Sequence, residues 1–316
     1  MHLHHPVAAY CVGLGSVCFK PFLTRKMKNM IRSRIAPTPS GLLHLGNAVN
    51  FVLTWLMVRR AGGTLRLRID DADCLRAKPE YLEDIFRQLD WLTLTWDEGP
   101  AGPDDFRRRF SQQLRKERYR NFLAELELLG HLYPCGCSRS TIRQHAPDGV
   151  YPGFCRDRAG AFKPGEAQRV RVPEGSVFRV EGQDIALCKA MGDFVLWRKE
   201  DLPAYQVVSL VDDLDDRINC IVRGQDLLPS TAAQLFLAGL HGDNFFAETT
   251  FYHHPLVMGD DGRKLSKSDN AVSLAALRER EPSPIPVYQE VARQVGIDPA
   301  GIATLEELLF RFCEMP

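Results

Sequence analysis

The sequence predicts an α/β fold in which helices cover a doubly wound parallel β-sheet. A strand–helix–strand pattern, the unit typical of nucleotide-binding folds, occupies residues 31–70. Buried-strand patterning returns in YQVVSLVDD (205–213) and INCIVRG (218–224), after a long stretch of different composition. Two separated halves of one parallel sheet, with a segment inserted between them, account for both observations.

The elements of the first half follow from local patterns. A short strand is expected from Ile31, closed by the apolar residues Ile35 and Ala36, and APTPSG (36–41) is typical of a turn. From 48 to 57 apolar residues recur with helical spacing, and two glycines at 62 and 63 end the helix. TLRLRID (64–70) then alternates apolar and polar residues, as a half-buried strand does.

Two further helices and a change of texture complete this half. One helix is expected to begin at Pro79, because proline is favoured in a first helical turn. The other is expected to end at Gly130 after passing through Leu114, Phe122, Leu126 and Leu129. Beyond it the composition shifts toward Cys, Pro and Gly. The chain is therefore divided into an extension (1–30), a first half (31–131), an inserted subdomain (132–199), a second half (200–255), and a loop with a short helical tail (256–316).

Composition and the N-terminal residues constrain the class of protein. With 45% hydrophobic and 25% charged residues, the 316-residue chain has the composition of an ordinary globular protein. Forty basic and forty acidic residues cancel, so a nucleic acid would need a local basic face. Nine cysteines favour a reducing, cytoplasmic compartment. Basic residues follow the apolar run 7–19, the reverse of a secretory signal, so we expect residues 1–30 to be disordered or to precede the true start. No stretch has the length of a membrane span.

Two motifs are candidates for chemistry. HLGN (44–47) lies just inside the first strand–helix turn, where a helix N-terminus attracts phosphate. GRKLSKSDN (262–270) places two lysines in a glycine-bounded loop that is rich in donors for phosphate oxygens. Taken singly, a histidine of this kind is most often structural, and a charged loop is most often a solvated surface. Their joint occurrence favours a phosphate-binding site.

These motifs carry a family resemblance. HLGN and KLSKS (264–268) resemble the two signatures of the class I aminoacyl-tRNA synthetases. RIAPTPSGLLHLGN, LRIDDAD, AYQVVSLVDD and IVRGQDL, in this order, resemble the glutamyl branch of that family. The resemblance covers roughly residues 32–270 and implies a class I, Rossmann-type catalytic domain.

The resemblance implies roles for the residues of both motifs. His44, Gly46 and Lys267 would be catalytic: His44 and Lys267 would stabilise the phosphates of ATP in the transition state, and Gly46 would leave room for adenosine. ATP, with Mg as its counterion, would be a substrate. Such catalysis needs positioning and electrostatic stabilisation, with no covalent enzyme intermediate. The ATP site is assigned to His44, Gly46, Asn47, Lys264, Ser266 and Lys267.

The amino-acid site is carried over in the same way. Arg34 would meet the substrate's side-chain carboxylate, for which a guanidinium fork is suited. Asp70 would hold the α-ammonium, although bacterial glutamyl enzymes carry Glu there and Asp resembles glutaminyl and archaeal-type enzymes. Two arginines favour L-glutamate over a neutral amide. The glutamate site is assigned to Arg34, Ala36, Thr38, Asp70, Tyr205 and Arg223.

The inserted subdomain carries a possible metal site. Cys135 and Cys137, followed by Tyr151 and Cys155 in VYPGFC, offer three thiolates and one phenolate oxygen, enough for four-coordinate zinc. Three buried thiols without metal remain the alternative reading. The spacing resembles the zinc site of one subgroup, the glutamyl-queuosine tRNA(Asp) synthetases, whose insertion corresponds to an acceptor-end domain. One structural zinc per chain is implied.

The C-terminal residues favour the same subgroup. Too few residues follow Ser268 for the helical anticodon-binding domain of a full glutamyl-tRNA synthetase, so none is expected. The subgroup places glutamate on the queuosine base of tRNA(Asp), and a monomer is expected. Phosphate contacts could come from Arg139, Arg143, Arg156 and Arg158. Two alternatives stay open: a ligase that transfers glutamyl adenylate to another acceptor, a tRNA 3′ end or a non-RNA molecule, and a retired synthetase-like binding module.

Overall fold

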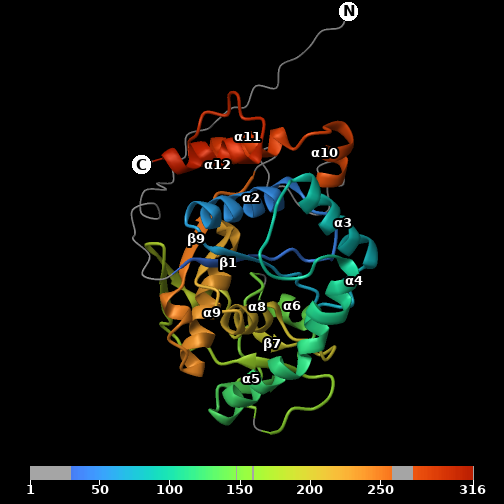
Figure 1. Ribbon diagram of the computed structural model, residues 1–316. Helices are drawn as coiled ribbons and strands as arrows, with labels where there is room; N and C mark the ends of the chain where they lie inside the picture. The colour runs from blue at the N-terminus through green and yellow to red at the C-terminus, as the bar shows by residue number, and fades with distance from the viewer. Residues whose placement is uncertain (1–29, 147, 159, 258–272, 316) are drawn as a thin grey trace, which may run out of the picture.

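The computed structural model describes residues 30–146, 148–158, 160–257 and 273–315, and Figure 1 shows its arrangement. A β–α–β unit begins the described chain: β1 (Arg32–Ile35), α2 (Leu45–Arg60) and β2 (Thr64–Leu67). β1 and β2 pair in parallel. A second parallel pair follows much later in the chain, β8 (Cys220–Gly224) with β9 (Thr250–His254). The predicted parallel strands are therefore present as two two-stranded sheets.

The two parallel pairs are joined through β1 and the residue that precedes β8. Asn219 donates its backbone N–H to the carbonyl of Arg32 at 3.0 Å. In return the Asn219 side-chain oxygen accepts the backbone N–H of Arg32 at 2.8 Å. This exchange aligns the carboxyl ends of strands from both halves of the chain along one edge, where α/β folds bind ligands.

One predicted strand is wrong. YQVVSLVDD forms the helix α8 (Tyr205–Asp215), not a strand. Every residue from Gln206 to Leu214 is buried, whichever side of the helix it lies on. Only Tyr205 and Asp215, at the two ends, are exposed. A helix that is surrounded by protein lacks the 3.6-residue apolar stripe, so its run of Val and Leu cannot be distinguished from a buried strand by periodicity.

The helices between β2 and the inserted segment follow the prediction only in part. α3 (Pro79–Trp91) begins at the predicted proline. The second predicted helix is interrupted: a π turn and a 3-10 turn precede an α-helix that begins only after Leu114. Leu114 and Leu129 are exposed and do not contribute to the core stripe. These elements are α4 (Pro103–Asp105), η1 (Phe106–Phe110), η2 (Gln112–Arg115) and α5 (Lys116–Leu128).

Residues 132–199 build antiparallel structure, in contrast to the parallel pairs. Three strands form a sheet in the order β3-β4-β7, and β5 and β6 form a separate hairpin. Their ends are linked by short helices. The elements are β3 (Leu132–Cys135), α6 (Arg139–His145), β4 (Ala167–Val170), β5 (Val177–Val180), β6 (Gln183–Ala186), α7 (Leu187–Ala190) and β7 (Val195–Trp197).

The C-terminal helices pack on α2, where Figure 1 shows α11 and α12 beside it. The Arg60 guanidinium at the end of α2 donates to the carbonyls of Phe312 and Met315, each at 2.9 Å. Tyr288 donates its hydroxyl to the carbonyl of Leu92 at 3.0 Å. The remaining elements are η3 (Gln225–Leu227), α9 (Leu228–His241), η4 (Phe246–Glu248), α10 (Leu274–Arg280), α11 (Ile285–Val295) and α12 (Leu305–Glu314).

Two large apolar cores hold these layers together. One surrounds α2 and includes the C-terminal helices, and the other joins α5, α8 and α9 to the inserted strands. Cys188, Cys220 and Cys313 have no partner at metal-ligand spacing, so the sequence predicts that they are core residues. Cys220 is buried in the first core, and Cys188 is half-buried against the second. Cys313 was expected in a core and is exposed. α12 buries one face, which carries Leu308 and Phe312. Cys313 follows Phe312 and therefore points about 100° away from that face, which explains its exposure.

A helix able to span a membrane would have to be longer and more apolar than any that the structure describes.

Candidate active site

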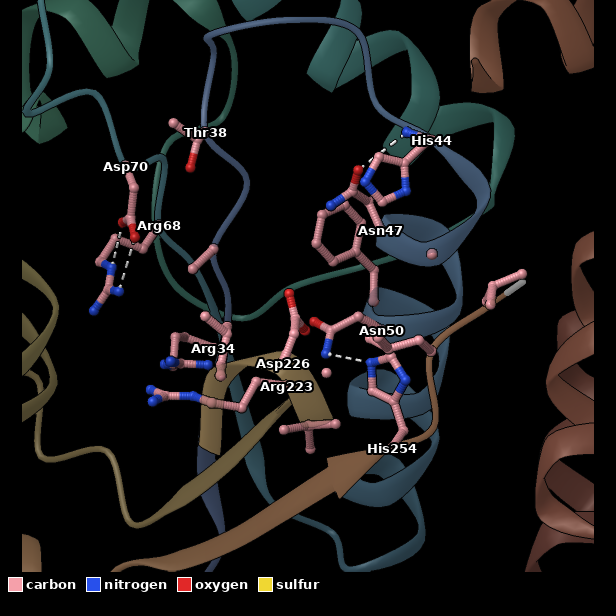
Figure 2. Close-up of a pocket in the computed structure, with 18 of the residues that line it drawn as sticks. Arg34, Thr38, His44, Asn47, Asn50, Arg68, Asp70, Arg223, Asp226 and His254 are labelled. Atoms are coloured by element: carbon pink, nitrogen blue, oxygen red, sulfur yellow. Dashed lines mark hydrogen bonds and ion pairs between the residues drawn. The ribbon is translucent and has the colours of Figure 1, made fainter. Parts of the chain in front are cut away.

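A cavity of about 610 Å³ opens where the parallel strands end, beside the N-terminus of α2. Its walls come from the carboxyl ends of β1, β2, β8 and β9, and Figure 2 shows the side chains that face it. Lys264, Ser266 and Lys267 lie outside the described residues. The structure brings together around this cavity all the other residues assigned to the two substrates, namely Arg34, Ala36, Thr38, His44, Gly46, Asn47, Asp70, Tyr205 and Arg223.

The N-terminus of α2 faces the cavity with a fixed geometry. His44 is the N-cap residue, and its backbone N–H donates to the side-chain oxygen of Asn47 at 3.0 Å. A Cβ atom at Gly46 would lie 3.1 Å from Cε1 of the His44 ring, so glycine allows the imidazole to lie close to the helix. The free N–H groups and the dipole of a helix N-terminus stabilise anions. This end of the cavity therefore suits phosphate.

Asp213, on α8, is the carboxylate shared by three arginines that line the cavity. Its carboxylate accepts from Nε of Arg34 at 2.8 Å and from Nη1 of Arg68 at 2.7 Å, and Nη2 of Arg223 lies 4.0 Å away. Burial by itself would raise the pKa of Asp213, but the guanidinium groups of Arg34 and Arg68 outweigh it and lower that pKa. Three buried arginines thus share this one carboxylate.

Asp70 offers a carboxylate with 11% side-chain exposure to the cavity. It accepts from Nε and Nη2 of Arg68 at 2.7 and 3.1 Å and from the Gln112 amide at 3.0 Å (Figure 2 shows the pair with Arg68). Burial raises the pKa of Asp70, and the Arg68 cation offsets this only in part. An additional cation at this carboxylate would relieve its desolvation.

Arg223 is almost fully buried, and two of its nitrogen atoms have no hydrogen-bond acceptor among the described residues. Its Nη1 donates to the Thr231 hydroxyl at 3.1 Å and to the Gln234 side-chain oxygen at 2.8 Å. Within the described part of the chain, its Nε and Nη2 have no hydrogen-bond acceptor, although the side chain is only 3% exposed. Burial lowers the pKa of Arg223. An anionic ligand in the cavity would supply both the acceptors and the counter-charge.

The structure adds residues that the sequence analysis did not select. Asn50, on α2, donates its amide to Nε2 of His254 at 3.2 Å, and Nδ1 of His254 donates to the carbonyl of Pro255 at 2.8 Å (Figure 2). A carbonyl only accepts, so the proton is assigned to Nδ1. Burial lowers the pKa of His254, which agrees with a neutral ring.

Some of these additional residues could have been found from the sequence. Arg68 is two residues from Asp70, which the sequence analysis did select, so both lie on one face of TLRLRID and at the same wall. Asp213 ends the quoted motif AYQVVSLVDD, but the sequence does not show its pairing with Arg34, which is 179 residues away in the chain. The other cavity residues that were missed are Asn50, Phe51, Val222, Gly224, Asp226, Leu227, His254, Leu256 and Val257.

The predicted cysteine cluster forms at the end of β3. The sulfur atoms of Cys135, Cys137 and Cys155 lie within 4.8 Å of one another, and those of Cys137 and Cys155 are 3.6 Å apart. The Tyr151 hydroxyl lies 3.5 Å from the sulfurs of both Cys135 and Cys137. Neighbouring ligands of tetrahedral zinc, at about 2.3 Å for sulfur and about 2.0 Å for oxygen, are separated by similar distances. The four side chains therefore fit a tetrahedral metal.

The surroundings of the cluster constrain Tyr151. Its hydroxyl oxygen accepts the backbone N–H of Cys155 at 2.9 Å, and the Arg169 guanidinium lies 3.8 Å from the centre of its ring. Burial, followed by the neighbouring thiols, raises the pKa of the Tyr151 phenol. In the metal-free cluster this side chain is therefore neutral, and a bound cation would be needed to favour the phenolate.

The arginines proposed to contact RNA divide into two pairs. Arg139 and Arg143, on α6, are exposed. Arg156 donates to Asp193 at 3.2 Å, and Arg158 forms an ion pair with Glu166 at 2.7 Å. The charge of the second pair is thus already compensated within the protein, which weakens its case as a phosphate contact.

The chain is similar to a known protein family and to several known proteins. The family model for the catalytic domain of class I tRNA synthetases (E and Q) matches residues 30–153 and 162–309. A glutamyl-Q tRNA(Asp) synthetase of Symbiobacterium thermophilum is 39% identical over 293 residues, 85% of this chain and 87% of that protein. A glutamate–tRNA ligase 2 of Syntrophus aciditrophicus is 34% identical over 89% of this chain and 61% of its own length.

Among solved structures, a glutamate tRNA ligase from Elizabethkingia meningosepticum in complex with its amino acid superposes with a TM-score of 0.71. The sequence identity is 22%, and the match covers 89% of this chain. The chain spans 64% of the length of that protein, just under two thirds. The likeness shows that the two share a fold.

Proposed function

The chain belongs to the class I tRNA synthetases of the glutamate and glutamine group and is a ligase-type enzyme; from this membership we propose that it joins L-glutamate to ATP as glutamyl adenylate and transfers the glutamyl group to queuosine in tRNA(Asp). The observation that carries the first step is the cavity itself. It combines a helix N-terminus suited to anions with the Asp70 carboxylate and with Arg223, whose Nε and Nη2 have no acceptor among the described residues.

We propose that the substrates occupy opposite ends of this cavity. ATP, with Mg, would place its phosphates at His44 and the α2 N-terminus, and Lys267 would approach them from the loop. The α-carboxylate of glutamate would attack the α-phosphate of ATP and release pyrophosphate. Charge that develops on the leaving group is stabilised by donors held ready in advance, so the protein needs no covalent intermediate.

The charges around Asp213 support glutamate over glutamine. Arg34, Arg68 and Arg223 share Asp213, and Asp70 pairs with Arg68, so within this ion-paired group three cations face two carboxylates. A side-chain carboxylate of the substrate supplies a further negative charge, whereas a neutral amide does not. Asp70 remains the partner proposed for the substrate's α-ammonium.

We propose that Cys135, Cys137, Tyr151 and Cys155 hold one structural zinc ion. When bound, the ion would tie the end of β3 to the loop that precedes β4 and add to the free energy of folding. The proposal rests on sulfur and oxygen separations that match a tetrahedral ion.

Cys135→Ser is expected to lower zinc content and thermal stability together. The wild-type protein should contain about one zinc per chain, because the cluster offers one complete set of four ligands. Metal analysis by mass spectrometry and calorimetric melting of the same samples test this. Cys313→Ser is the matched control, because Cys313 is exposed and outside the cluster; wild-type protein that holds no zinc when prepared without chelator would contradict the site.

We expect queuosine-containing tRNA(Asp) to be the acceptor of the glutamyl group. Glutamate and ATP should form adenylate without RNA, and labelled glutamate should then appear on queuosine-containing tRNA(Asp) but not on tRNA(Glu) or on tRNA(Asp) that lacks queuosine. Nuclease cleavage of the labelled tRNA should place the label on the anticodon fragment. The name of the Symbiobacterium relative, which matches over 87% of its length, supports this choice.

Other outcomes identify the alternatives. Label on the 3′-terminal fragment, or equal labelling with and without queuosine, indicates ordinary aminoacylation, as the match to a glutamate–tRNA ligase would suggest. Exchange of ATP with pyrophosphate but no labelled RNA indicates another acceptor. The absence of exchange with every amino acid indicates a binding module.

A further inference from the structure

We propose that Glu181, in the inserted segment, is a positioning residue for Arg223, and that it acts through His253 and Thr231. This inference rests on the proposed function, because it concerns how the amino-acid site is held. Glu181 lies in the turn of the β5–β6 hairpin, His253 lies in β9 and Thr231 lies in α9. Three elements from different parts of the chain therefore converge behind one cavity wall.

The first step of the network joins the hairpin to β9. The Glu181 carboxylate lies 2.6 Å from Nδ1 of His253 and accepts the backbone N–H of the same residue at 3.1 Å. A carboxylate that accepts at Nδ1 assigns the proton to that nitrogen. The His253 side chain is 1% exposed, so its ring has little freedom to seek other partners.

The second step joins β9 to the cavity. Nε2 of His253 lies 2.8 Å from the Thr231 hydroxyl, and the same hydroxyl oxygen accepts Nη1 of Arg223 at 3.1 Å. The Thr231 hydroxyl has two possible acceptors, Nε2 of His253 at 2.8 Å and the carbonyl of Leu227 at 3.2 Å. With Nδ1 protonated, Nε2 can only accept, so we assign the hydroxyl proton to this shorter contact, and a lone pair of the hydroxyl oxygen remains for Arg223. The side-chain oxygen of Gln234, one turn further along α9, accepts a second hydrogen bond from the same Nη1. Because Nη1 is held by two acceptors, the donors that remain, Nε and Nη2, keep a fixed direction.

The backbone at Glu181 gives independent support. Glu181 has a φ of 47° and Gly182 a φ of 82°, so both turn residues are left-handed. Such a two-residue turn is favoured by Asn, Asp and Gly, and a glutamate there is unfavourable for the turn itself. The side chain's contacts with His253 offset this cost, which points to a role for the carboxylate beyond the turn.

The hairpin does not need Glu181 in order to dock. Val180 is buried in the second core, and Phe178 packs edge-on against Phe236 of α9 with ring centres 6.0 Å apart. Glu181→Ala should therefore remain folded while the network loses its first member. This property separates a positioning role from a purely structural one.

The test is the glutamate dependence of ATP–pyrophosphate exchange. Glu181→Ala is expected to raise KM for glutamate about tenfold, with kcat and KM for ATP within about twofold of wild type, since outer partners of a binding group commonly change its affinity by this factor. Glu181→Gln, which keeps one carbonyl acceptor, should recover part of the loss. Asp184→Ala in the same hairpin is the control, because Asp184 is exposed and, among the described residues, its only ion pair is with Arg179 at 3.5 Å.

A double-mutant cycle and a direct probe complete the experiment. Glu181→Ala and Thr231→Val should not add, because they interrupt one network; additive effects on KM, or an unchanged KM in Glu181→Ala, would overturn the proposal. The ¹⁵N spectrum of the His253 ring should show a protonated Nδ1 in the wild type and a changed ring in Glu181→Ala. Should the wild type fail to exchange with glutamate, the proposed function fails, and this spectrum alone then decides the network: an unchanged ring overturns it.

Discussion

Asp213→Asn is expected to lower the free energy of unfolding by about 3–5 kcal/mol, the cost of breaking a buried ion pair by removing one partner. Asp213 has no exposed side-chain surface and accepts hydrogen bonds from Arg34 and Arg68. An asparagine would keep the shape but direct its NH₂ group toward one of these cations, and both buried charges would lose their counter-ion. Urea unfolding at pH 7, followed by circular dichroism, measures the effect.

Asp215→Asn on the same helix is the matched control. Asp215 is 30% exposed and pairs with Arg115 and Arg118 near the surface, where such pairs contribute about 1 kcal/mol or less. The pKa of Asp213 is lowered on folding, so its contribution is present above the unfolded pKa and is lost as pH falls through the folded pKa. The difference between wild type and variant should therefore persist from pH 7 to pH 5; equal losses in both variants would contradict a central role for Asp213.

Lys267→Ala is expected to reduce ATP–pyrophosphate exchange by at least about a hundredfold. One charge held ready at the leaving phosphates contributes about 3 kcal/mol to transition-state stabilisation in comparable sites. The measurement is kcat in exchange with saturating glutamate and ATP, accompanied by a melting curve. Lys267 follows the pattern of the family's second motif and lies outside the described residues.

The control for this variant is Lys189→Ala, which changes an exposed lysine of the inserted segment that is not among the residues lining the cavity. It should leave exchange within about twofold of wild type. Near-wild-type exchange in Lys267→Ala would remove this lysine from the mechanism and leave the α2 N-terminus as the main phosphate site.

The local parts of the fold could be predicted because their signals are contained within short windows. Pro79 begins α3, and the residues of TLRL pair as β2. The cysteine cluster was also accessible, because two close pairs of residues need only one loop to bring them together. The helix α8 was mistaken for a strand, because burial on every side removes the polar stripe that distinguishes a helix.

The site was predictable only where the family motifs marked it. Arg34, His44 and Arg223 belong to such motifs, and the structure brings them to one cavity. The hydrogen bonds that position these three side chains could not be predicted from the sequence. Asp213 and Arg34 are separated by 179 residues, and His253 and Glu181 by 72, so nothing in either local sequence indicates the partner.

The pairing of Arg32 with Asn219 limits how early the sheet can be completed while the chain is being synthesised. The two residues are 187 positions apart, and a ribosome adds about 5 to 20 residues each second, so β1 emerges about 10 to 40 s before the residue that joins it to β8. During that interval β1 can pair with β2, but Arg34 has no Asp213 and one edge of the sheet is open. The inserted segment is translated in the same interval, and its antiparallel strand pairs can form then, although its apolar core is completed only by α8 and α9. The amino-acid cavity is consequently among the last features of the nascent protein to be completed.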